Sequence, residues 1–116
     1  NTTIFQVTKN ALKRRRTRPA DFGLPEGKNS HLISSSPKES AKIILDIFDG
    51  SGSDINSSSE EISRRNCVII NSAAAIFVSG LSDSFQDAAI VAADSIDSGS
   101  AKLKLNNLID ITTKMK

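Results

Sequence analysis

Cys67-Val68-Ile69-Ile70-Asn71-Ser72-Ala73-Ala74-Ala75-Ile76-Phe77-Val78 is the stretch that decides how this chain can fold, because nearly every residue in it is apolar or small. Ser58 and Glu61 precede it with the spacing of a capping box and Gly80 follows it, which predicts a helix over residues 58–80. A strand over 67–70 is the alternative, since Val-Ile-Ile favours β structure. The length of the run favours the helix, and a helix that is apolar on all sides needs protein packed around it.

One further helix is predicted before this central helix and one after it. Ser36-Pro37-Lys38-Glu39 has the pattern of a capping box with Pro at the first helical position, and Gly50 ends the helix predicted over 36–50. Asp83 and Gln86 are expected to cap a helix over 83–99. That helix carries one apolar stripe, formed by Phe85, Ala88, Ala89, Ala92 and Ile96.

A last helix is predicted over residues 100–114, with Ser100 as its cap. Four apolar residues share one face of it, namely Ala101, Leu105, Leu108 and Ile109. Its lysines, Lys102, Lys104 and Lys114, are expected to face water. Irregular connections are predicted over 21–36 and 50–59, where Gly, Pro and Ser gather.

The amino-terminal residues predict a β-hairpin. Residues 2–7 are rich in β-branched and aromatic types, residues 8–11 form a turn-like tetrapeptide, and 12–17 supply the second strand. The second strand contains Lys13-Arg14-Arg15-Arg16 and has no apolar face, so it suits a solvent-facing edge where charge discourages further pairing. Pro19 cannot donate to a ladder and ends this strand.

The predicted fold class is therefore α/β: a hairpin followed by three or four helices that pack on a sheet. A hairpin has no third strand to extend it, so we expect most of that sheet to come from residues missing upstream. The chain begins at Asn1 within strand-like residues, which also suggests an upstream part. With 116 residues, five Phe and no Trp or Tyr, a self-sufficient core is not expected.

Composition excludes several classes of protein. The net charge of +2 gives no argument for nucleic acid or a membrane surface as a partner of the whole chain. One Cys excludes a disulfide framework, and one Cys with one His excludes a zinc centre. We expect a reducing compartment, the cytoplasm, and neither a signal segment nor a membrane span.

The candidate functional residues each have a plain structural alternative. The basic run of Lys13, Arg14, Arg15, Arg16 and Arg18 could contact phosphates, but no aromatic residue is interleaved with it, and a solvated edge strand is favoured. His31 lies in a Ser-rich connection without a nearby carboxylate or Cys, which favours a surface histidine. Cys67 opens an apolar stretch and is expected to act as a small buried hydrophobe.

Two carboxylate pairs could bind a hard cation: Asp94 with Asp97, and Glu60 with Glu61. No Gly-rich phosphate cradle accompanies them, so solvated helix faces are favoured. From the residues themselves we therefore assign no catalytic, cofactor-binding or metal-binding side chain.

Four segments resemble anthranilate phosphoribosyltransferases. Arg18-Pro19-Ala20-Asp21-Phe22-Gly23-Leu24 is similar to the Pro-Glu-Asp-Phe-Gly-Leu segment of that family. The others follow in the family's order, at residues 36–45 with a closing Gly50, at residues 68–80, and at residues 92–101. The chain departs from the family at Ile33-Ser34-Ser35, where the family has Gly-Gly-Asp, and at Ser40, where Asn is usual.

The resemblance implies that residues 1–116 are the carboxyl-terminal part of a large α/β domain, with the hairpin and Asp-Phe-Gly-Leu segment in residues 1–24. It implies transfer of the 5-phosphoribosyl group from phosphoribosyl pyrophosphate to anthranilate in tryptophan biosynthesis, with Mg²⁺. In the family, the pyrophosphate loop, the anthranilate contacts and the magnesium ligands lie upstream of the position of Asn1. No site residue is therefore carried over. A homodimer through an absent helical domain is also implied.

A different class of function stays open beside this resemblance. The chain could be a small non-enzymatic module that binds nucleic acid through the basic strand Lys13–Arg18.

Overall fold

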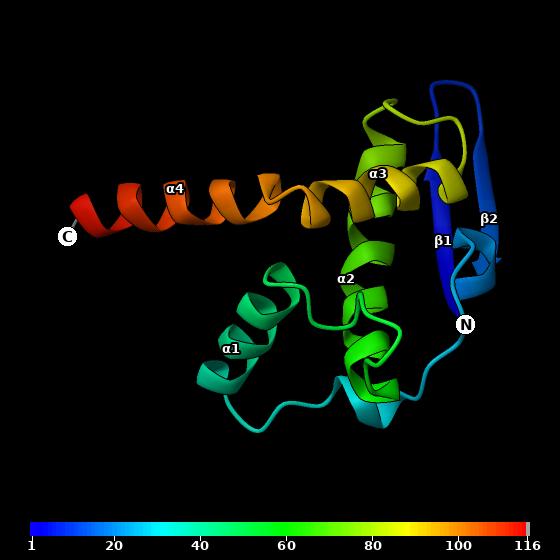
Figure 1. Ribbon diagram of the computed structural model, residues 1–116. Coiled ribbons are helices and arrows are strands. Elements are labelled where there is room, and N and C mark those ends of the chain that lie inside the picture. Colours follow the sequence, from blue (N-terminus) through cyan, green and yellow to red (C-terminus); the bar gives the residue numbers. More distant parts are fainter. Residues whose placement is uncertain (116) are drawn as a thin grey trace.

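The structure is a computed structural model, and it describes residues 1–115. A hairpin of β1 (Thr2–Val7) and β2 (Leu12–Thr17) leads into two short 3₁₀ helices, η1 (Pro19–Phe22) and η2 (Asn29–Leu32). Four α-helices follow: α1 (Pro37–Phe48), α2 (Ser59–Val78), α3 (Phe85–Asp97) and α4 (Ser100–Lys114) (Figure 1). This order confirms the predicted α/β class, and each α-helix lies within the range predicted for it.

The central helix is α2, as the apolar stretch predicted, and no strand forms over residues 67–70. Figure 1 shows α3 crossing its carboxyl-terminal half. Ala73 of α2 and Ala88 of α3 are both 0% exposed, because small side chains let the two backbones approach closely at the crossing. The predicted stripe of α3 is buried in full, and the core contains Phe22, Ile47, Ile69, Ala73, Phe85, Ala88, Ala89, Ala92 and Ile96.

Aromatic packing joins the amino-terminal part of the chain to the helices. The ring of Phe22 stacks on that of Phe85 with centroids 4.7 Å apart, and Phe77 meets Phe85 edge-on at 4.6 Å. The guanidinium of Arg15 lies over Phe85, 4.7 Å from its centroid. The expectation that β2 only faces solvent is therefore wrong for Arg15, since one face of the hairpin covers an aromatic residue.

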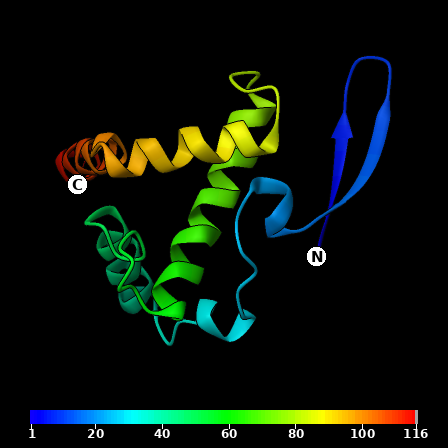
Figure 2. The same cartoon turned by 45° about the vertical axis from the view of Figure 1, so that its right-hand side comes forward.

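The hairpin is antiparallel, with Ile4 opposite Arg15 and Phe5 opposite Arg14. Because side chains alternate along a strand, Ile4 and Arg15 belong to the face toward the helices and Phe5 and Arg14 to the outer face. Ile4 packs against the core, whereas Phe5 is 61% exposed. Figure 2 shows the hairpin standing at one side of the helices.

Two helix caps differ from prediction. Helix α3 is capped by Ser84, whose hydroxyl accepts from the backbone N–H of Asp87, and not by Asp83. Helix α4 begins after Gly99, which has φ +84°, a left-handed conformation that glycine adopts without strain; Ser100 is the first helical residue and not the cap. The spacing of polar residues identified both helices correctly but placed these caps one residue away.

Helix α4 extends from the end of α3 to the opposite side of the molecule from the hairpin (Figure 1). None of its residues is buried. Lys102 does not simply face water as predicted, since it forms an ion pair with Asp49 at the end of α1. Within residues 1–115, no helix is both long and apolar enough to cross a membrane.

Candidate functional site

A pocket of about 390 Å³ lies between the base of the hairpin, the η1–η2 segment and one face of α2. Ile4, Phe22 and Ile70 give it an apolar wall, because η1 packs against the long helix and Ile4 of the hairpin packs against the core beside them. Asn66 and Asn71 add amide groups from successive turns of α2. The volume falls in the range of sites for small ligands.

The chemistry of this pocket is that of binding. Of the described residues that line it, the charged ones are Arg18 and Lys28, and none is an Asp, Glu or His. The lining offers cationic and amide donors but contains no His or carboxylate, the side chains that most often act as general bases. Cys67 lies on the wall of the pocket and is partly exposed, whereas the sequence predicted a small buried hydrophobe.

The basic run is divided between the two faces of the hairpin. Lys13 and Arg15 belong to the face toward the helices, and Arg14 and Arg16 to the outer face. In the described part of the chain none of these four forms an ion pair with a carboxylate, and all four are exposed. Phe5 is remote from Arg14 in the sequence but lies directly opposite it, so the basic run has an aromatic neighbour that its own sequence does not reveal.

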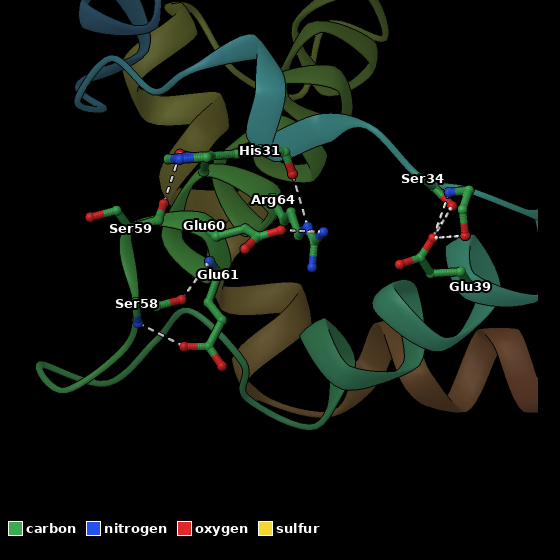
Figure 3. A network of polar contacts seen from close by, with 10 residues as sticks. His31, Ser34, Glu39, Ser58, Ser59, Glu60, Glu61 and Arg64 are labelled. Atoms are coloured by element: carbon green, nitrogen blue, oxygen red, sulfur yellow. Dashed lines mark hydrogen bonds and ion pairs between the residues drawn. The ribbon is translucent and has the colours of Figure 1, made fainter.

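His31, predicted to be a surface histidine, is partly exposed and also takes part in hydrogen bonds with residues of α2. Its Nδ1 lies 2.9 Å from the hydroxyl of Ser63, and its carbonyl oxygen accepts a hydrogen bond of 2.9 Å from Arg64 Nε (Figure 3). Ser63 donates its hydroxyl hydrogen to the carbonyl of Ser59 at 2.8 Å. That donation leaves the serine unsuited to act as a nucleophile with His31 as its base.

Further polar contacts involve Arg64 near the start of α2 and Glu39 near the start of α1. Arg64 forms an ion pair of 2.5 Å with Glu60 one turn earlier (Figure 3). Glu39 accepts hydrogen bonds from the hydroxyl of Ser35 at 2.7 Å and the N–H of Ser35 at 2.5 Å, and the hydroxyl of Ser34 also donates to it. The Ser35 hydroxyl and N–H, with help from Ser34 and the charge of Arg64, hold the pKa of Glu39 below its ordinary value.

The capping box predicted at the start of α1 is half correct. Ser36 accepts from the N–H of Glu39, but the carboxylate of Glu39 reaches Ser35 and not the N–H of Ser36. The box predicted for α2 is complete, with Glu61 accepting from the N–H of Ser58 at 2.7 Å. The network therefore orders helix starts and the chain that leads into them.

The carboxylate pairs do not meet the needs of a magnesium site. Nη2 of Arg65 lies 2.8 and 2.9 Å from the two oxygens of Asp97, and Glu60 and Glu61 are engaged with Arg64 and Ser58. Over residues 1–115, His, Cys, Asp and Glu form no group that could hold a metal ion. Asp97 lies on an exposed helix face, as predicted, and its ion pair with Arg65 also joins α3 to α2.

Comparison with known proteins identifies the family. The family described as glycosyl transferase family, a/b domain, matches residues 1–102. The chain belongs to the glycosyl transferase family. Its a/b-domain segment thus includes the hairpin, the pocket, the polar network and helices α1 to α3.

Several curated relatives of this glycosyl transferase chain are named anthranilate phosphoribosyltransferase. The anthranilate phosphoribosyltransferase of Methanobrevibacter smithii is 34% identical over 111 residues, which are 96% of this chain and 30% of the relative. Those of Anaeromyxobacter sp. and Priestia megaterium are 31% and 34% identical over 97% and 92% of this chain. The chain spans less than a third of the length of these relatives. No solved structure gives a significant match.

Proposed function

We propose that this chain is a part of an anthranilate phosphoribosyltransferase, a glycosyltransferase that moves the 5-phosphoribosyl group from phosphoribosyl pyrophosphate to anthranilate in tryptophan biosynthesis. The observation that supports it is similarity along 96% of the chain to a relative with that name. In this reaction the amine of anthranilate forms a bond to the anomeric carbon of the ribose. Pyrophosphate leaves with the electrons of the broken C–O bond, and the amine loses a proton.

The role proposed for residues 1–116 is that of a scaffold at the carboxyl-terminal part of the phosphoribosyltransferase domain. Support comes from how the polar side chains are used. His31, Arg64 and Glu39 order helix starts, and Arg65 with Asp97 joins two helices. The described residues that line the pocket include no His, Asp or Glu. Such packing would hold catalytic loops of the remaining domain in their productive positions.

The remaining parts of the proposal concern the whole protein. Phosphoribosyl pyrophosphate and Mg²⁺ would bind to residues outside this chain, because the carboxylates described above do not fit a metal ion. The protein would form a homodimer through a separate helical domain. A single cysteine suits a reducing compartment, and we place the protein in the cytoplasm.

A second candidate function is binding of single-stranded nucleic acid by the hairpin. The observation in its favour is that Phe5 lies beside Arg14 and Arg16 on the outer face, and an exposed aromatic ring between cations can stack a base. The division of the basic run between two faces counts against it, because a single face then carries only two of the four cations from residues 13–16.

The proposed function is tested by following the loss of anthranilate fluorescence with the intact protein that contains this chain. We expect turnover that needs both phosphoribosyl pyrophosphate and Mg²⁺, and no turnover by the 116-residue chain alone. A folded intact protein without turnover would contradict the assignment. Turnover by the isolated chain would contradict the scaffold role.

A further inference from the structure

The pocket at the base of the hairpin combines an apolar wall with positive charge. Ile4, Phe22 and Ile70 form the wall, and Arg18 and Lys28 are the charged residues of the lining. Both cations are exposed, and within residues 1–115 neither forms an ion pair with a carboxylate. A pocket of about 390 Å³ with this lining suits a small ligand that is apolar at one end and negatively charged at the other.

The backbone that carries Lys28 is fixed on both sides of that residue. Gly27 lies so close to Ser63 of α2 that a side chain at position 27 would collide with the Ser63 hydroxyl. His31 Nδ1 lies 2.9 Å from the same hydroxyl, and the His31 carbonyl accepts a hydrogen bond of 2.9 Å from Arg64 Nε (Figure 3). A binding group on a fixed backbone loses less conformational freedom when a ligand binds.

Arg18 is held in a similar way at the end of β2. The buried Thr17 before it donates its hydroxyl hydrogen to the carbonyl of Thr2 at 3.1 Å, and the N–H of Arg18 donates to the carboxylate of Asp21 at 2.8 Å. Asp21 is the carboxylate nearest to Arg18 along the chain, but it is engaged with this backbone N–H and does not line the pocket. The pocket therefore has two cations from separate fixed segments, and its described lining contains no carboxylate to neutralise them.

We propose that this pocket binds a small carboxylic acid in its ionised form, with the carboxylate paired to Arg18 and Lys28 and an apolar ring or chain against the apolar wall. A phosphate or pyrophosphate fits less well. Such groups commonly bind at the start of an α-helix, whereas α2 lines the pocket only from Ser63 onward, beyond its first turn. The inference does not depend on the proposed function, because none of these residues has a part in the transfer reaction.

Isothermal titration calorimetry of the intact protein with 2-naphthoate tests this proposal, and 2-naphthalenemethanol is the neutral ligand with the same ring. We expect the alcohol to bind at least about tenfold more weakly than naphthoate, because it lacks the charge-assisted hydrogen bonds. Arg18→Gln and Lys28→Gln should each weaken naphthoate binding about tenfold for the same reason. Lys9→Gln is the matched control, because Lys9 is exposed in the hairpin turn and does not line the pocket, and it should leave the affinity unchanged.

Alkylation of Cys67 locates the bound ligand, because Cys67 is a partly exposed residue of the pocket wall. Iodoacetamide labelling of the intact protein is followed by mass spectrometry of the peptide that contains Cys67. At a naphthoate concentration about ten times its dissociation constant, we expect the labelling to slow about tenfold.

Failure of naphthoate to bind at millimolar concentration would overturn the proposal, and this is the result expected if other residues of the intact protein fill the pocket. Equal affinity for the alcohol would also overturn it, as would naphthoate binding that leaves the labelling of Cys67 unchanged. Neither measurement uses the transfer reaction. An intact protein that binds naphthoate at this site but does not convert anthranilate would therefore contradict the proposed function and not this inference.

Discussion

Glu39 shows how single side chains in this fold serve local order. Its carboxylate receives two hydrogen bonds from Ser35 and one from Ser34, immediately before α1 begins. These donors favour the ionised form, which is why the pKa lies below its ordinary value. A group with a lowered folded-state pKa stabilises the fold above its unfolded pKa, about 4.3, and loses that contribution as pH falls through the folded value.

We therefore expect Glu39→Gln to lower the melting temperature of the intact protein near neutral pH by a few degrees, and to have almost no effect at a pH below the folded pKa of Glu39. Glu26→Gln, in an exposed connection, is the matched control and should change neither melt. Thermal melts at both pH values check this. An equal loss of melting temperature at both pH values would show that the carboxylate contributes through packing and not through its ionisation.

The hydrogen-bond partner of His31 could not be predicted from the sequence. The local composition around it favoured solvent exposure, but Ser63, its hydroxyl partner, lies on α2, and no local pattern links the two. Arg15 is a similar case, because its place over Phe85 depends on how the hairpin meets α3. Periodicity predicts which face of an element is buried, whereas a polar partner from another element depends on tertiary packing.

The contact between α2 and α3 combines apolar packing with one buried charge. Arg65 is 6% exposed and its Nη2 contacts both oxygens of Asp97, whose side chain is half exposed. Within residues 1–115 its Nη1 is buried without a hydrogen-bond acceptor. Removing Asp97 would leave more of a buried cation unpaired, which is costly.

We expect Asp97→Ala to destabilise the intact protein by about 2 kcal/mol. Asp94→Ala is the control, because Asp94 is an exposed carboxylate on the same helix and forms no ion pair in the described chain; its effect should stay within about 0.5 kcal/mol. Urea unfolding of the two variants measures both values. Similar shifts for both would contradict a stabilising role for the Arg65–Asp97 pair.

The helices were predictable from their apolar residues and end signals: α3 has a periodic stripe that is buried, and α2 has a long apolar run between a capping box and a glycine. The residues that cap the helices were less predictable. Asp83 with Gln86 and Ser84 with Asp87 have the same spacing, and the sequence could not decide between them; the structure uses Ser84. The 3₁₀ helices η1 and η2 went unpredicted because they are single turns, too short to show a period.

In the molecule as a whole, the core lies where α2 and α3 cross, and the hairpin and α4 extend away from it. The core centres on α2, α3 and η1, while α4 has no buried residue and the hairpin leaves its outer face bare. Figures 1 and 2 place these two elements on opposite sides. The sequence correctly indicated a two-stranded hairpin followed by helices. It could not predict the pocket, whose lining comes from separate segments between Asn1 and Ala74.

We expect the exposed apolar surfaces of the hairpin and of α4 to be covered by further protein. Thermal unfolding of the isolated 116-residue chain, followed by far-ultraviolet circular dichroism, tests that view directly. We expect a broad transition or aggregation, because too little apolar surface is buried for a cooperative fold. A sharp, reversible transition of a compact monomer would contradict it and show that the chain is an autonomous domain.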